Sequence, residues 1–224
     1  TYGWIVGELI RRVTGRSPGR FLAAEITGPI GADFHIGLEP CHETRVCRMI
    51  GPPEPEDPAI RAAMRQFTGP DTLLGRALHG PSELFHYDDM WNTRALHAAE
   101  LPSSNGIGTA RGLAGIYAAT IAEKPGTRIL SPETITQSTA PRATGKDAIL
   151  GVPTVFGRGF MRPPALAPSA GQASFGHPGA GGSLGLADPE RFMAFGYVMN
   201  RMAPGLSGDI RADELLRAAS QAAS

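Results

Sequence analysis

The pattern of apolar residues changes near residue 150, and this change constrains the fold more than any other feature of the chain. Before it, apolar side chains recur at helical spacing in several segments. After it, strand-like runs alternate with glycine and proline, at 153–161, about 173–177, 182–187 and 192–199. Helices followed by an antiparallel meander and a closing helix predict an α+β fold, in which helices flank a mainly antiparallel sheet.

Helix start signals divide the chain further. Residues 2–14 are expected to form a helix, because Ile5, Leu9 and Val13 share one face. Serine, threonine or aspartate caps the free N–H groups at a helix start, and proline fits the first turn. Such signals predict five more starts: Ser17-Pro18, Asp57-Pro58, Thr109, Ser131-Pro132 and Asp209. Residues 34–50 are expected to form one or two short strands, the last over 45–50, whereas 68–104 has no clear period.

The balance of charge argues against several classes of partner. The 224 residues carry 21 basic and 21 acidic side chains, whereas a nucleic-acid groove or an anionic membrane surface requires net positive charge. No apolar run approaches the ~20 residues that span a bilayer. Cys41 and Cys47 make no disulfide framework, and together with His42 they match zinc-site spacings poorly. Two unpaired thiols are therefore the preferred interpretation.

The chain begins at Thr1, without methionine and inside an expected helix. We therefore expect residues 1–224 to be the C-terminal portion of a single domain, with 1–150 mostly helical and 151–224 formed by antiparallel strands and a closing helix. A secretion signal cannot be judged from such a portion, and a cytoplasmic location is the default assumption.

The densest cluster of glycines, FGHPGAGGS, lies at 175–183. Glycine in a strand gives up side-chain packing, which makes sense where a ligand or another backbone approaches closely; a simple bend between strands is the alternative. Residues 181–185 also match the G-x-S-x-G pattern of α/β-hydrolases. However, Ser183 is expected between two strands rather than before a helix, and the last histidine, His177, precedes it. Ser183 is therefore not expected to be a nucleophile.

The same segment resembles the third motif of the β-lactamase and penicillin-binding-protein superfamily. There a Lys-Thr-Gly strand, or a His-x-Gly or Trp-x-Gly variant in esterase-like members, lines the active site. Three stretches carry the resemblance in order along the chain: YGWIVGELIRRVTGRS at 2–17, PSSNG at 102–106 with TARGLA at 109–114, and GHPGAGGS at 176–183 continuing through DPE at 188–190 to YVMN at 197–200.

The resemblance implies a mechanism and a set of site residues. In this superfamily the serine of a Ser-x-x-Lys motif attacks an acyl carbonyl and forms an acyl-enzyme, with no metal or organic cofactor. By this resemblance His177 takes the lysine position, and the backbone N–H of Ala180 is one of two oxyanion-hole donors. Substrate-lining roles follow for Pro178, Gly179, Gly181 and Asn105. For Asn105 a purely structural turn is the alternative.

The nucleophile motif itself is missing from the 224 residues. Ile121 stands three positions before Lys124, and Ala143 three positions before Lys146. We therefore expect the nucleophile upstream of Thr1, and Tyr2 to be a packing residue rather than the catalytic phenol. A polar and aromatic cluster could line the substrate entrance or form a solvated loop: His86, Tyr87, Asp88, Asp89 and Trp91.

Together these observations predict a serine hydrolase, most simply a carboxylesterase in the whole protein, with a small-molecule ester or amide as substrate. The 224 residues alone are expected to be inactive. Histidine in place of lysine favours neutral esters over substrates with a carboxylate. The alternatives are a β-lactamase or D-alanyl-D-alanine carboxypeptidase, and, from another class, a non-catalytic binding protein of the same fold. The oligomeric state stays open.

Overall fold

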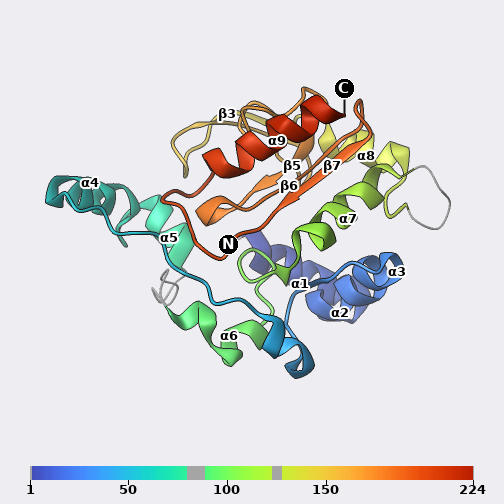
Figure 1. Ribbon diagram of the computed structural model, residues 1–224, viewed down its shortest axis with the longest axis horizontal. Helices are drawn as coiled ribbons and strands as arrows, with labels where there is room; N and C mark the ends of the chain where they lie inside the picture. The colour runs from blue at the N-terminus through green and yellow to red at the C-terminus, as the bar shows by residue number, and fades with distance from the viewer. Residues whose placement is uncertain (1, 80–88, 123–127, 224) are drawn as a thin grey trace.

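The computed structural model describes residues 2–79, 89–122 and 128–223 (Figure 1). Its α-helices are α1 (Tyr2–Thr14), α2 (Pro18–Leu22), α3 (Gly28–Ile30), α4 (Pro58–Thr68), α5 (Leu73–His79), α6 (Arg94–Ala98), α7 (Ala110–Ile121), α8 (Pro132–Thr139) and α9 (Ile210–Ala222). A π-helical turn, η1 (Ala23–Thr27), joins α2 to α3. The 3-10 turns are η2 (Pro40–Arg45), η3 (Asp89–Asn92) and η4 (Ala180–Gly182).

The five predicted helix starts are confirmed by their side-chain caps. In each case the capping oxygen accepts a hydrogen bond from a backbone N–H in the first turn, which has no partner inside the helix. The pairs are Ser17 with Arg20, Asp57 with Ala59, Thr109 with Gly112, Ser131 with Thr134, and Asp209 with Arg211. Thr93 caps α6 in the same way.

The strands form one larger antiparallel sheet and one small pair. β5 (Phe175–Pro178), β6 (Leu184–Asp188) and β7 (Met193–Tyr197) make a meander, and β3 (Ala143–Lys146) pairs with β4 (Pro153–Phe156). Met161 bridges Phe156 at the end of β4 and Gly176 in β5, so the two groups belong to one sheet. β1 (Phe34–His35) pairs separately with β2 (Ile107–Gly108). Helices flank these antiparallel strands (Figure 1), which confirms the predicted α+β class.

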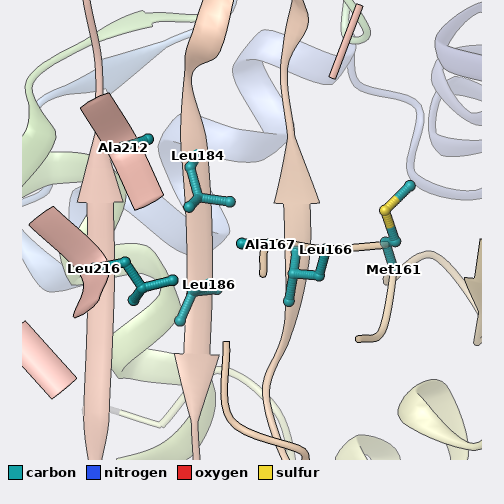
Figure 2. Close-up of a cluster of buried hydrophobic side chains, with 7 residues drawn as sticks. All are labelled: Met161, Leu166, Ala167, Leu184, Leu186, Ala212 and Leu216. Atoms are coloured by element: carbon teal, nitrogen blue, oxygen red, sulfur yellow. The ribbon is translucent and has the colours of Figure 1, made fainter. Parts of the chain in front are cut away.

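The two faces of the meander are covered by different helices. Leu184 and Leu186 of β6 pack with Ala212 and Leu216 of α9, as Figure 2 shows. Alternation along the strands turns the neighbouring Gly185 to the opposite face. There a Cβ on Gly185 would lie 2.3 Å from the Tyr117 ring of α7. Glycine at this position thus lets α7 lie directly against the sheet.

Two amphipathic helices turn their apolar side chains outward. α1 buries its small residues, Gly3 and Gly7, whereas Ile5, Leu9 and Val13 are 65%, 58% and 75% exposed. The apolar face of α4 is exposed in the same way, through Ile60, Met64 and Phe67. Within residues 2–79, 89–122 and 128–223, no helix combines the length and apolar character needed to cross a membrane.

Two features of the sheets differ from expectation. The strand predicted over 45–50 is wrong, because only Ile50 forms a bridge, a parallel one to Arg201. The 3-10 turn η2 ends at Arg45, and residues 46–49 that follow it have no regular structure. β3 was not expected, since Ala-Thr-Gly-Lys shows no alternation and all four residues are exposed. The single-domain assignment, with its division near residue 150, stays a prediction.

Candidate active site

The glycine-rich segment forms the end of β5 and a tight turn. Within the ladder His177 lies opposite Gly185, and Pro178 lies opposite Leu184. The chain then reverses through η4, where Gly181 and Gly182 have φ angles of +78° and +119°. Residues other than glycine rarely adopt such angles. The glycines are therefore needed to turn the chain back from β5 into β6.

The backbone N–H of Ala180 is an unpaired donor in this turn, among the described residues. Gly179 N–H donates to the Ser183 carbonyl at 2.7 Å, and Gly181 N–H donates to the Gly205 carbonyl at 3.2 Å. Ala180, the first residue of η4, has no acceptor for its N–H among the described residues, and it is partly exposed. A free N–H at a turn can stabilise a developing oxyanion. The oxyanion-hole role of Ala180 stays a prediction.

The turn is held in place by the start of α9. The Gly181 carbonyl accepts hydrogen bonds from the Ala203 N–H at 2.9 Å and from the Arg211 guanidinium at 3.2 Å. The same guanidinium pairs with Asp209, whose side chain is only 2% exposed. This hydrogen bond holds the pKa of the Asp209 carboxyl below its usual value. From the sequence we expected Asp209 only as a helix cap, and no local signal marked Arg211.

His177 stands on the open side of β5. Its ring is exposed, and its Nδ1 lies 2.6 Å from the carbonyl oxygen of Pro178. The ring of Phe156 lies beside it, with centroids 6.1 Å apart. Crowding by the surrounding chain removes water from the imidazole and lowers the pKa of His177, and the Pro178 carbonyl opposes this shift. A lowered pKa favours a neutral ring near pH 7.

The remaining residues of the glycine-rich segment pack against other parts of the chain. Pro178 and Gly181 are buried, and a Cβ on Gly181 would lie 2.7 Å from the Met202 side chain. Gly179 is packed against Ser183, whose Oγ would lie 2.1 Å from an added Cβ. Ser183 leads directly into β6 and not into a helix, as the rejection of the G-x-S-x-G pattern required. Substrate contacts by Pro178, Gly179 and Gly181 stay predictions.

The side chain of Asn105 forms hydrogen bonds with backbone groups of the same chain. Its Oδ1 accepts from the Leu101 N–H at 2.9 Å, and its Nδ2 donates to the carbonyls of Leu96 and Ala99 at 2.8 and 2.6 Å. The residue is 6% exposed. This arrangement favours the structural alternative, in which Asn105 holds the connection between α6 and β2.

The remaining candidates lie apart from this segment in their contacts. Tyr2 is 64% exposed, and its hydroxyl lies 3.4 Å from where a Cβ on Gly159 would stand. Asp89 accepts a hydrogen bond from Arg48 at 2.6 Å, and the Trp91 carbonyl faces Nε2 of His97 at 2.9 Å. The rest of that predicted cluster, His86, Tyr87 and Asp88, lies outside the described residues.

The thiols and the potential metal ligands of the described residues show no arrangement that could bind a metal ion. Cys41 and Cys47 are both free and exposed. In the parts of the chain that the structure describes, no group of three or more His, Cys, Asp or Glu side chains is arranged to hold a metal ion.

Comparison with known proteins identifies relatives along the whole chain. The chain is 34% identical over 208 residues to the esterase/beta-lactamase LipL of Mycobacterium tuberculosis, which covers 90% of this chain and 47% of LipL. The structure of EstA from Arthrobacter nitroguajacolicus matches 100% of the chain with a TM-score of 0.85 and 31% identity. A family VIII carboxylesterase matches 98% of it with a TM-score of 0.79 and 33% identity.

The matches cover nearly all of this chain but only part of each relative. The chain spans 58% of the EstA chain and 56% of the carboxylesterase chain, so it corresponds to about half the length of its relatives. The Beta-lactamase family itself is matched by residues 1–220. The chain therefore belongs to the β-lactamase family.

Proposed function

We propose that the chain forms one wall of the active site of a serine hydrolase, and that the whole protein is a carboxylesterase. The observation that carries the proposal is the unpaired N–H of Ala180, presented by a glycine-dependent turn at the end of β5. Ala180 follows His177 by three residues, and the exposed His177 side chain with the Ala180 N–H would give a substrate both a specificity element and a donor. The names of the relatives EstA and family VIII carboxylesterase support ester hydrolysis.

In the proposed reaction, the hydroxyl of a serine outside the 224 residues attacks the acyl carbonyl of the ester. The carbonyl oxygen becomes an oxyanion, which accepts hydrogen bonds from the Ala180 N–H and from the N–H of that serine. The C–O bond to the alcohol then breaks, and the alcohol leaves with a proton. Water attacks the acyl-serine in the same way and releases the carboxylic acid. No lysine of this chain follows a serine by three positions, so the Ser-x-x-Lys motif must be supplied from elsewhere in the protein.

The test begins with the full-length coding region, which should contain Ser-x-x-Lys. The full-length protein should hydrolyse p-nitrophenyl butyrate and react with a fluorophosphonate probe, and replacing that serine by alanine should abolish both. Ala180→Pro then removes the proposed donor, with a fall in kcat of ~10²–10³-fold. Gly179 has ψ 158°, which is the conformation a following proline prefers. Ala180→Ser keeps the N–H and should keep nearly full activity.

Three outcomes would redirect the proposal. A full-length sequence without Ser-x-x-Lys would indicate a non-catalytic binding protein. Hydrolysis of nitrocefin without ester hydrolysis would indicate a β-lactamase, an activity that the name of LipL also carries. Release of D-alanine from a D-alanyl-D-alanine peptide, with no ester hydrolysis, would indicate a carboxypeptidase.

A further inference from the structure

The His177 side chain is placed where a bound substrate could reach it. Phe175 and His177 alternate with Gly176 and Pro178 along β5, so they share a face of the strand. Phe175 is fully buried and packs edge-on against Phe160, with ring centroids 4.8 Å apart. His177 is the exposed residue of β5, at the end from which the chain enters η4. Its free edge is therefore available to a ligand that also approaches Ala180.

The hydrogen bond to Pro178 determines which ring nitrogen carries the proton. A backbone carbonyl oxygen only accepts hydrogen bonds, so Nδ1 of His177, 2.6 Å away, must be the donor. A neutral imidazole has one N–H and one lone pair. With the proton on Nδ1, the lone pair is on Nε2. No described residue donates to Nε2.

The surroundings of the ring favour this neutral form. Neighbouring segments remove part of the water around the ring although the residue is exposed, and this loss of water is the main cause that lowers the pKa of His177; the hydrogen bond to the Pro178 carbonyl opposes the shift. No carboxylate contributes. Across the ladder, Gly185 lies opposite His177 and touches Tyr117 of α7. Burial raises the pKa of Tyr117 to about 12, so this phenol is also uncharged at neutral pH.

We propose that Nε2 of His177 is a hydrogen-bond acceptor for the substrate, so that the site selects esters carrying a hydroxyl or N–H donor over matched esters carrying a carboxylate. This inference rests on the proposed esterase function and deepens it. A lone pair attracts a donor but offers nothing to a carboxylate, whose oxygens only accept. The ammonium group of a lysine at this position would donate hydrogen bonds and would favour the ester with a carboxylate. One neutral hydrogen bond corresponds to a preference of roughly 3–10-fold in kcat/KM.

The experiment compares three aryl esters of one acyl length, ending in a hydroxyl, a methyl or a carboxylate group, with the full-length protein at pH 8. We expect the order hydroxyl, methyl, carboxylate, with the hydroxyl ester favoured over the methyl ester by roughly 3–10-fold in kcat/KM. In His177→Phe the ratio of the two kcat/KM values should fall to about one, and the circular dichroism spectrum and melting temperature of the variant show that it is folded. Below the lowered pKa of His177 the ring becomes a cation and Nε2 becomes a donor. The kcat/KM for the carboxylate ester should therefore rise, relative to the other two esters, as the pH falls.

A matched control and a direct readout complete the test. His42→Gln changes a histidine of η2 whose ring packs against that of His35, with centroids 4.8 Å apart, and should keep both the preference and its pH dependence. Equal rates for the hydroxyl and methyl esters, or a preference that survives in His177→Phe, would overturn the inference but leave the esterase function standing. If no ester is hydrolysed, the esterase function fails, and the inference fails with it. In an active protein, ¹⁵N NMR of the His177 ring reports directly which nitrogen carries the proton. A proton on Nδ1 supports the inference, and a proton on Nε2 alone refutes it.

Discussion

Replacing Gly182 by alanine should destabilise the protein more than the same replacement at Gly205. Both glycines have strongly positive φ angles, +119° and +127°. An alanine forced into such a conformation costs about 1–3 kcal/mol, and this cost is common to both variants. The surroundings differ, because an added Cβ at Gly205 would meet nothing within 4 Å, whereas at Gly182 it would lie 2.0 Å from Oδ2 of Asp209.

The clash at Gly182 cannot be relieved by a simple side-chain rotation. Asp209 is 2% exposed, and its Oδ1 caps α9 by accepting from the Arg211 N–H at 2.8 Å. Loss of a cap costs about 0.5–2 kcal/mol, and overpacking costs about 1–3 kcal/mol. Gly182→Ala should therefore lose about 2–4 kcal/mol more than Gly205→Ala.

Urea unfolding, followed by circular dichroism of the full-length protein and the two variants, measures this difference. The midpoint should shift while the dependence on urea concentration stays constant, since the surface exposed on unfolding is unchanged. If the two variants differ by less than about 0.5 kcal/mol, the range of ordinary surface substitutions, the contact between η4 and the α9 cap does not stabilise the fold.

Three further predictions concern other parts of the chain. Asn105→Ala should reduce the free energy of unfolding by about 2–4 kcal/mol, because it leaves three backbone groups unpaired; urea unfolding with no measurable change would contradict this. The lowered pKa of Asp209 stabilises the fold above the ordinary carboxyl pKa, and this contribution is lost as the pH falls through the lower folded value. Melting temperatures between about pH 5 and pH 2 should therefore fall less steeply in Asp209→Asn than in the parent. Finally, Ile5→Glu with Leu9→Glu should reduce binding of the dye ANS to the 224-residue chain, whereas Arg12→Gln, at an exposed polar position, should leave it unchanged.

The helix starts could be predicted because their signals are local. A capping serine, threonine or aspartate and the N–H group it accepts from lie two or three residues apart in all five predicted cases. No knowledge of the rest of the fold is needed to recognise such a pair.

The strands were harder because their partners are distant in sequence. β3 exists through its pairing with β4 and has no apolar alternation of its own. Residues 45–50 look like a strand in the sequence, yet among them Ile50 alone forms a bridge, to Arg201. In α1 the periodic apolar residues identified the helix correctly, but the face that packs against the described chain is the one with Gly3 and Gly7.

In the candidate site, too, features set by neighbouring residues could be predicted from the sequence, and features set by distant residues could not. The turn around Ala180 was found from the sequence because four glycines in nine residues demand unusual backbone angles or close contacts. Arg211 was missed, since it lies 30 positions from Gly181 and reaches the carbonyl of that residue only in the folded chain. The Nδ1 hydrogen bond of His177 could not be foreseen either, because it depends on the ring orientation.

The attachment of η4 to the first turn of α9 has a practical consequence for mutational surveys. Because Asp209 and Arg211 hold the turn that presents Ala180, a scan scored by activity should find these two positions as sensitive as β5 itself. Versions of the full-length protein that lack α9 should therefore lose activity as well. A library restricted to β5 and η4 would miss both positions, so the first turn of α9 belongs among its targets.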